Sequence, residues 1–264
     1  MVVILEGGCR VSQMHYGEPL VEGTLRIWKQ IGRATGAQAI SLRVMEFAPG
    51  LSPTIQNDDS DEILYVLDTT REEVSTTRES GWVNVLIDGQ SREVGPDSGI
   101  YIRPRQTFAI DNHGPESITI ISSQCPDPDH APAFVSSTAS LRDPTTDLSS
   151  SIVRLADQRA QPTADRWYRV LVDDEIGSAQ VTQFVGSIPP GRAPDHFHHY
   201  EEVLFILKGE GRMWAGETNT PVAPGSCIYL PKGQVHCVEN TGEGELRLLG
   251  VFYPAGSPSV RYES

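Results

Sequence analysis

The chain has 264 residues, and 35 acidic against 21 basic side chains leave a formal net charge of −14 with a sequence pI of about 4.9. Nucleic acids and anionic membranes attract basic surfaces, so this balance argues against both as partners. The length allows two ordinary domains or one large β domain, and a hydrophobic content of 38% suits sheets with one wet face.

The beginning of the chain gives no sign of a targeting segment. Met1 to Glu6 are too few for a signal peptide and lack its basic residues, and no apolar run approaches the length of a membrane span. The four cysteines form no Cys-x-x-Cys pair, which favours free thiols in a reducing compartment. We therefore expect a cytoplasmic protein.

Strands dominate the expected secondary structure, because runs of Val, Ile, Thr and aromatic residues alternate with Gly, Pro and Asn turns. Residues 1–36 are predicted to form an N-terminal arm, in which Leu25 to Trp28 is the best packing segment. Residues 37–125 form a first strand-rich domain that contains a long polar hairpin loop from Asp68 to Gly81.

The second half of the chain begins with a linker. Residues 126–165 are rich in Pro, Ser, Thr and Asp, with room for a short helix between Asp147 and Asp157. Residues 166–256 form a second strand-rich domain, and residues 257–264 form a tail.

The second domain carries a spaced set of metal-binding side chains. Alternate residues of a strand face the same side, so His196 and His198 are expected to point together. Glu202 opens the next apolar run, and His236 comes from a further strand, just after a Pro-Lys-Gly turn. Three imidazoles and a carboxylate suit one divalent transition metal, which could be Fe, Mn, Ni, Cu or Zn.

Two neighbours of these residues lie in the opposite strand phase. His199 and Glu201 are predicted to face solvent or the rim of the domain. Glu201 would replace Glu202 as a ligand if the preceding loop were one residue shorter. Glu202 shares its phase with Leu204 and Ile206, which fits an inward face, so Glu202 is favoured.

The stretches around these residues resemble the two conserved motifs of the cupin superfamily. The first reads Gly-x4-His-x-His-x3-Glu-x6-Gly from Gly191 to Gly209, with four rather than five residues before the first histidine. The second reads Gly-x5-Pro-x-Gly-x2-His-x3-Asn from Gly225 to Asn240 and matches at every specified position. The resemblance implies an all-β, jelly-roll-like antiparallel barrel (a double-stranded β-helix). It also implies an internal metal held by His196, His198, Glu202 and His236.

The chain also repeats itself. Pro96 to Asn112 matches Pro224 to Asn240 at an offset of 128 residues, and Glu62 to Leu67 matches Glu202 to Leu207 at an offset of 140. The whole chain therefore resembles a bicupin, in which two tandem barrels arise from one duplication and follow an N-terminal arm.

The ligand positions do not survive in the first copy. Gln56 and Asp58 correspond to the first two histidines, Glu62 corresponds to Glu202, and Phe108 corresponds to His236. Because this set has no imidazole and one position that cannot bind a metal, we expect one metal per chain and a structural first barrel filled by Phe108. The alternative is a weak oxygen-lined site for a hard cation, formed by Asp58, Asp59, Asp61 and Glu62. A run of acidic residues on a loop is, however, more typically solvated.

Three further residues are candidates for contact with a substrate. Phe252 shares its phase with Leu248 and Gly250 and is predicted to face inward. Trp214 has no firm phase, so barrel core or a domain interface explains it equally well. Arg192, in the loop before the histidines, could bind a substrate carboxylate with two hydrogen bonds, although a loop arginine is more often solvated.

These features lead to three hypotheses about function. Four protein ligands on an octahedral ion leave two positions for water, dioxygen or a small substrate. The main expectation is a dioxygenase-type oxidoreductase that acts on a small oxygen-rich molecule, with Glu202 as both ligand and proton carrier. A non-redox isomerase, decarboxylase or hydrolase of a small acid or sugar is the alternative, and a non-catalytic metal- or ligand-binding protein is the third. The sequence does not fix the oligomeric state and leaves a homodimer open.

Overall fold

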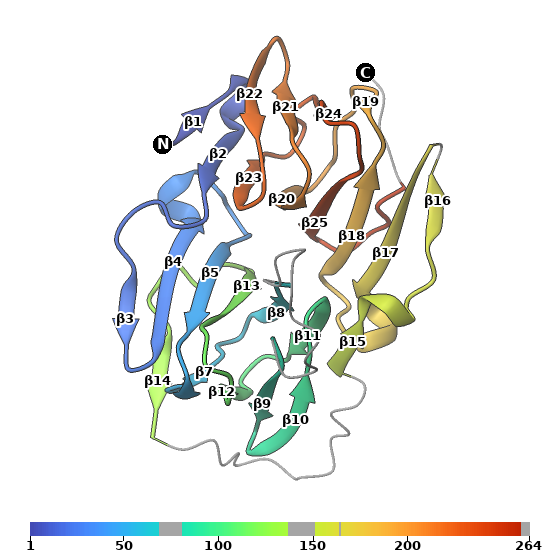
Figure 1. Cartoon of the computed structure of the whole chain (residues 1–264). Helices are drawn as coiled ribbons and strands as arrows, with labels where there is room; N and C mark the ends of the chain where they lie inside the picture. Colours follow the sequence, from blue (N-terminus) through green and yellow to red (C-terminus); the bar gives the residue numbers. More distant parts are fainter. Residues whose placement is uncertain (69–80, 137–150, 164, 260–264) are drawn as a thin grey trace.

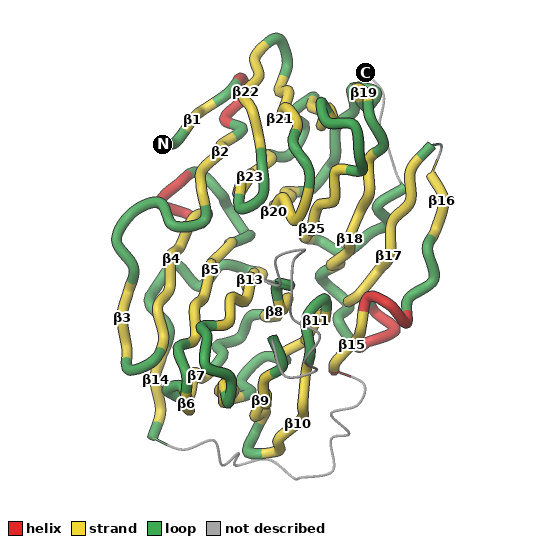
Figure 2. Tube along the Cα trace, in the orientation of Figure 1, coloured by secondary structure: helices red, strands yellow, loops and turns green. Residues whose placement is uncertain are grey.

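The computed structural model describes residues 1–68, 81–136, 151–163 and 165–259, and these residues form two β-barrels side by side (Figures 1 and 2). The expected all-β fold with two tandem barrels is confirmed. The helical segments of the described residues are short 3₁₀ turns: η1 Glu6–Gly8, η2 Arg33–Thr35, η4 Leu155–Asp157 and η5 Asp174–Ile176. Within this described part, no helix is both long enough and apolar enough to span a membrane.

The first barrel is made of two antiparallel sheets that face each other. One has the order β15-β11-β8-β13-β5-β4-β3. Its strands are β3 Leu20–Glu22, β4 Leu25–Ile31, β5 Leu42–Phe47, β8 Asp61–Val66, β11 Ser98–Ile102, β13 Ile118–Cys125 and β15 Ile152–Arg154. The other has the order β10-β9-β12-β7-β14, with β6 also paired to β12. Its strands are β6 Gly50–Leu51, β7 Thr54–Gln56, β9 Val83–Ile87, β10 Gln90–Val94, β12 Thr107–Asn112 and β14 Ala133–Val135.

The second barrel repeats this plan. Its larger sheet has the order β1-β2-β23-β20-β25-β18-β17-β16. The strands are β1 Val3–Ile4, β2 Arg10–Gln13, β16 Gln161–Thr163, β17 Arg166–Val172, β18 Thr182–Ile188, β20 Glu201–Lys208, β23 Ser226–Leu230 and β25 Leu246–Tyr253. The facing sheet has the order β19-β24-β21-β22, with bounds β19 Gly191–Arg192, β21 Gly211–Ala215, β22 Thr218–Val222 and β24 His236–Asn240.

The two barrels exchange strands. The N-terminal strand β2 pairs with β23 of the second barrel, whereas β3 and β4 join the first. In the same way, β15 pairs with β11 of the first barrel before β16 and β17 enter the second. Each repeat therefore begins with a strand that completes the sheet of the other repeat, so residues 1–36 are divided between the two barrels.

The segment predicted as a linker, residues 126–165, also contributes strands. Besides β15, it supplies β14, which pairs with β7 on the first barrel. The helix expected between Asp147 and Asp157 is replaced, where the structure describes this stretch, by β15 and the turn η4. The predicted hairpin loop between Asp68 and Gly81 lies almost wholly outside the described residues.

Three apolar cores hold the molecule together. One fills the first barrel and includes Phe108, which is fully buried there as predicted. A second fills the second barrel. The third combines residues of both, among them Tyr65 of β8 and Val203 of β20, and lies between the barrels. Strands β8 and β20 are therefore buried on both faces over most of their length.

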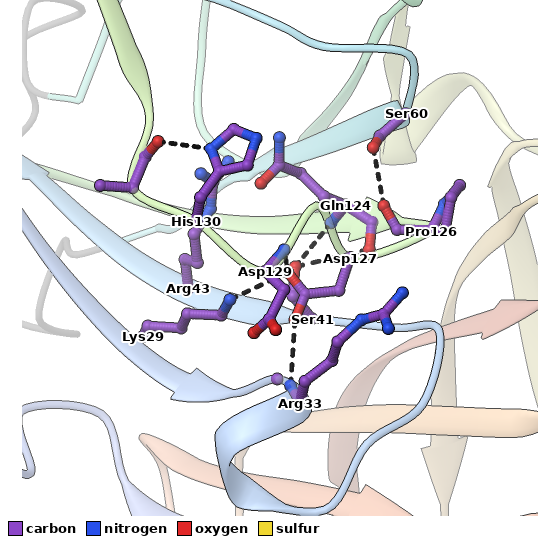
Figure 3. A network of polar contacts seen from close by, with 12 residues as sticks. Lys29, Arg33, Ser41, Arg43, Ser60, Gln124, Pro126, Asp127, Asp129 and His130 are labelled. Carbon is purple, nitrogen blue, oxygen red and sulfur yellow. Dashed lines mark hydrogen bonds and ion pairs between the residues drawn. The ribbon is translucent and has the colours of Figure 1, made fainter.

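A buried carboxylate fixes the loop of the first barrel that meets the second. Asp127 is 2% exposed and accepts hydrogen bonds from the Lys29 ammonium at 2.9 Å and the Arg33 backbone N–H at 3.1 Å (Figure 3). Its own backbone N–H donates to the Ala39 carbonyl at 3.0 Å. These bonds hold residues 33–39 against the end of β13.

Candidate metal centre

Three histidines come together inside the second barrel. One ring nitrogen each of His196, His198 and His236 lies within 4.8 Å of the other two. His236 begins β24, and His196 faces it across an isolated bridge in which the two backbones exchange hydrogen bonds of 2.8 and 3.1 Å. In the described part of the chain, these histidines are the one group of three or more such donors placed closely enough to hold a metal ion.

Backbone carbonyls orient two of the rings. The Nδ1 atom of His196 lies 3.1 Å from the Pro194 carbonyl oxygen, and that of His236 lies 2.8 Å from the Gln234 carbonyl oxygen. A carbonyl can only accept, so each Nδ1 carries the proton and each Nε2 keeps its lone pair. Burial, reinforced by His196, lowers the pKa of His236 to about 4, so this ring is neutral at pH 7. Neutral imidazoles with fixed tautomers are the form that binds metal.

Glu202 lies beside the histidines at the start of β20. Its Oε2 is 3.5 Å from the Nε2 of His198, and the residue is only 5% exposed. Burial raises the pKa of this carboxyl to about 8, so it is mostly protonated at neutral pH when no cation is near. A divalent cation on the histidines would favour the carboxylate form and recruit it as a fourth donor. The donor set therefore fits a divalent transition metal.

The neighbour Glu201 corrects one expectation. It was predicted to face solvent or the rim, but it is 8% exposed and points toward the first barrel. Its carboxylate accepts hydrogen bonds from the backbone N–H groups of Gln38 and Ala39, at 2.7 and 2.6 Å, and from the Tyr229 hydroxyl. The strand phase was right, but the opposite face of β20 meets a second barrel instead of water. His199 is exposed.

The histidines and Glu202 line a cavity of about 110 Å³. Phe252, predicted to face inward, is 1% exposed and lines this cavity. Sequence reasoning missed several other lining residues, including Arg166, Tyr200 and Phe184. Tyr200 could have been suspected from its position between the ligand-type residues. Arg166 begins β17 and no motif marks it.

Arg192 and Trp214, the other two candidates for substrate contact, are not among the residues that line this cavity. Trp214 is on β21 in the phase opposite to the buried Met213 and Ala215, and its indole donates to the Glu239 carboxylate at 2.8 Å. The Arg192 guanidinium stacks on the Trp214 ring at 4.1 Å and pairs with Asp195 at 3.1 Å. The two side chains brace the outer face of the sheet that carries His236.

The first barrel fills the corresponding space differently. Glu62 occupies the place of Glu202, because it lies opposite Ile102 as Glu202 lies opposite Leu230. Its carboxylate pairs with the buried Arg43 guanidinium and accepts a hydrogen bond of 2.9 Å from the Ser122 hydroxyl.

The other acids of the predicted hard-cation site have separate partners. Asp58 lies 3.4 Å from His130, Asp59 pairs with Arg105, and Asp61 accepts a hydrogen bond from Tyr101. Gln56, at the end of β7, is exposed. No convergent group of donors exists among the described residues of this barrel, so the hard-cation alternative is not supported.

Comparison with known proteins gives one family. Residues 184–252 match the model of the cupin domain. An uncharacterized protein of Aquifex aeolicus is 34% identical over 86 residues, which cover 31% of this chain and 69% of that protein. Auxin-binding protein 1 of Arabidopsis thaliana is 32% identical over 86 residues, covering 29% and 43%. The oxalate-binding protein of Thermotoga maritima is 35% identical over 67 residues, covering 25% and 55%. The chain thus spans about half the length of the last two relatives.

Solved structures match over nearly the whole chain. A variant of the oxalate decarboxylase of Bacillus subtilis superposes with a TM-score of 0.72 and 15% identity, covering 93% of this chain and 77% of that one. A second structure of that enzyme, described for its Mn(II) centres, gives a TM-score of 0.72 at 14% identity and covers 94% and 78%. At such identity the likeness shows a shared two-barrel fold alone.

Proposed function

The chain belongs to the cupin superfamily and has two tandem barrels. On this premise we propose that it is a metal-dependent enzyme that acts on a small organic acid without net oxidation by dioxygen, as a decarboxylase or isomerase does. The observation that carries the proposal is the convergence of three imidazoles, two of them oriented by backbone carbonyls, and a buried carboxyl in one small cavity. The proposed ligands are His196, His198, Glu202 and His236. Manganese is the first candidate, since a solved relative in fold holds it, and the donor set also suits Fe, Ni, Cu and Zn.

The dioxygenase expected from the sequence has less support. The two solved structures of similar fold described above are of a decarboxylase, and one curated relative is named for oxalate binding. The cavity volume of about 110 Å³ also lies well below the roughly 300–1,000 Å³ of sites for larger ligands, which disfavours flavonols. We therefore rank a small non-oxidised acid first.

A divalent ion bound here would polarise a substrate oxygen and stabilise the negative charge that develops on it. The residues of the chain supply the rest. Arg166 can hold a substrate carboxylate through its planar guanidinium, which fixes the orientation of the acid. Glu202 can accept or return a proton, because its carboxyl lines the cavity beside the histidines, with Oε2 3.5 Å from the Nε2 of His198. The apolar side chains of the cavity keep water from the reacting carbon.

The test compares turnover with and without dioxygen. Purified protein is loaded with Mn(II) and incubated with a panel of small oxo and hydroxy acids, and products and CO₂ are followed by NMR and a coupled assay. We expect product to form without the consumption of one dioxygen per turnover. Oxygen consumption, with loss of turnover under argon, would instead identify a dioxygenase.

Glu202→Gln provides the matched variant, since it keeps the shape and one oxygen donor but loses the charge and the basicity. We expect metal to bind more weakly and turnover to fall by roughly 10²–10⁴-fold. Glu202→Ala should lose metal more severely. Unchanged turnover in Glu202→Gln would remove this residue from the chemistry.

A binding protein without activity is the second candidate. Three curated relatives are named as auxin-binding proteins and one as an oxalate-binding protein. Tight binding of an acid to the metal-loaded protein, with no product formed over many hours, would favour this function.

A further inference from the structure

The cavity of the second barrel has an apolar wall. Its side chains are all buried, and they are Phe184 of β18, Leu204 of β20, and Leu248 and Phe252 of β25. The Phe252 ring lies 5.8 Å from that of Phe184 and stacks on Tyr200 at 4.5 Å. Tyr200 in turn stacks on the imidazole of His198 at 4.7 Å with nearly parallel planes. Apolar surface therefore continues from the wall to a proposed metal ligand.

The fold does not require this wall to be apolar. In the first barrel, Arg43 lies directly opposite Ser122 on neighbouring strands. At the same place in the second barrel, Phe184 lies opposite Gly250. A Cβ atom on residue 250 would stand 2.4 Å from the Phe184 ring, so glycine makes the room that the ring fills. The first barrel thus holds a buried arginine at this place, and the second barrel holds a phenyl ring.

A single fixed cation joins the lining. Arg166 is the one lysine or arginine among the described residues around the cavity, and its side chain is 12% exposed. Its Nε lies 3.3 Å from the Asp165 carboxylate. A guanidinium presents five N–H donors in a planar fork, so Arg166 can bind a substrate carboxylate beside Asp165. A second carboxylate placed against Phe184 and Leu248 would lose its water without gaining a donor.

We infer that the cavity selects a short oxo or hydroxy monocarboxylic acid with an apolar body, which is aliphatic or a single aromatic ring. This inference rests on the proposed function and names its substrate class. In this proposal the substrate carboxylate binds Arg166, the oxo or hydroxy oxygen binds the metal, and the apolar body packs against the apolar wall. Oxalate, other dicarboxylates and sugar acids have no apolar part for the wall, so they bind more weakly.

Calorimetry on the Mn(II)-loaded protein tests the preference with a matched series of 2-oxo acids. Affinity should rise about fourfold for each methylene from pyruvate through 2-oxobutanoate to 2-oxopentanoate. It should fall at least tenfold from 2-oxohexanoate to 2-oxoglutarate, which is of similar length but ends in a second carboxylate. Equal or tighter binding of 2-oxoglutarate, or no dependence on body length, would overturn the inference.

Neighbouring leucines give the control for the wall. Leu248 lines the cavity, whereas Leu249 of the same strand packs in the core between the barrels. Both alanine variants should lower stability, but only Leu248→Ala should flatten the rise of affinity with body length. If Leu248→Ala does not fold, Leu248→Val provides the same comparison with a smaller truncation of the side chain. A flattened rise in Leu249→Ala would contradict the assignment of the wall.

The arginine is tested in the same way. Arg166→Gln should weaken all the monocarboxylates by about 10–100-fold and leave the dependence on body length unchanged. Arg169→Gln on the same strand is the control, since that side chain stacks on Trp167 and donates to the Leu155 carbonyl. Unchanged affinity in Arg166→Gln would remove the carboxylate from the inference.

Binding and turnover separate the two proposals. Apolar acids that bind as described but give no product would refute the enzyme and keep the substrate class. Turnover limited to dicarboxylates or sugar acids would keep the enzyme and refute the class.

Discussion

The two barrels provide different partners for a buried glutamate. Each places a buried glutamate at the same position of its central strand, Glu62 in β8 and Glu202 in β20. A buried carboxyl needs a partner or must take up a proton. In the first barrel the partner is the guanidinium of Arg43, which belongs to the chain. In the second it is a set of histidines that could hold an exchangeable ion, and only an ion leaves positions for a substrate.

The acidic residue that precedes each of these glutamates also differs in its hydrogen bonds at the interface between the barrels. Asp61 accepts a hydrogen bond of 2.5 Å from Tyr101, and the equivalent Glu201 accepts one from Tyr229. Glu201 also receives two backbone N–H groups from residues 38 and 39 of the first barrel. Since Glu201 precedes Glu202, the barrel without a metal site holds the strand that carries a proposed ligand.

The largest expected effect concerns metal stoichiometry. We predict one tightly bound transition metal per chain, in the second barrel, and its complete loss in His196→Ala plus His236→Ala. Binding energies of about 10–16 kcal/mol shared among four ligands imply a loss of roughly 5–8 kcal/mol for two. Plasma emission analysis checks this, with His199→Ala as the exposed control. Two metals per chain would break the contrast between the barrels.

The second prediction tests Arg43 as the internal cation of the first barrel. Arg43→Met strands the buried Glu62 carboxylate and should lower the free energy of unfolding by about 3–5 kcal/mol. Metal content of the folded protein should not change. Urea unfolding measures the loss, and Arg43→Met plus Glu62→Leu should recover most of it.

Arg105→Met is the control for Arg43, because the ion pair of Arg105 with Asp59 is exposed and its loss should leave the unfolding curve almost unchanged. A small effect of Arg43→Met would mean that Glu62 simply takes up a proton.

The third prediction concerns the clamp on Glu201. Glu201→Ala removes three hydrogen bonds to a carboxylate at the interface and should cost about 2–3 kcal/mol of stability. It should also weaken metal binding, because the neighbouring Glu202 loses its fixed position. Unfolding curves and metal titrations check both effects, with the exposed Glu210→Gln as control. Unchanged metal affinity would confine Glu201 to a structural role.

Counted per pH unit, the smallest effect is the pH dependence of metal binding. Burial raises the pKa of Glu202 to about 8, so metal displaces close to one proton at pH 7, and His236, with a pKa of about 4, stays neutral. Apparent affinity should therefore rise up to about tenfold per pH unit between pH 5 and 8 and then level off. The metal-free protein should behave oppositely: its stability should fall as pH rises from about 4.5, the ordinary pKa of a glutamate, to about 8, and then level off. Proton release measured in two buffers checks this, and Glu202→Gln should abolish it.

Much of the candidate site could be predicted from the sequence. The spacing of His196 and His198 fixes their common face through the two-residue period of a strand, and the repeat places His236 and Phe108 at equivalent positions. The loss of imidazoles from the first copy also predicts which barrel keeps a convergent group of metal-binding side chains. These features can be predicted because strand periodicity and an internal repeat depend only on the spacing of residues along the chain.

The tertiary structure decided what each face meets. Periodicity put Glu201 opposite Glu202, but only the packing of two barrels shows that this face is buried and bonded to residues 38 and 39. It likewise turned Trp214 outward, brought Arg166 to the cavity and set Arg43 on Glu62. The exchange of β2 and β15 follows the same rule. A strand fixes the direction of its side chains locally, whereas their partners come from segments distant in sequence and are set by the closure of the sheets.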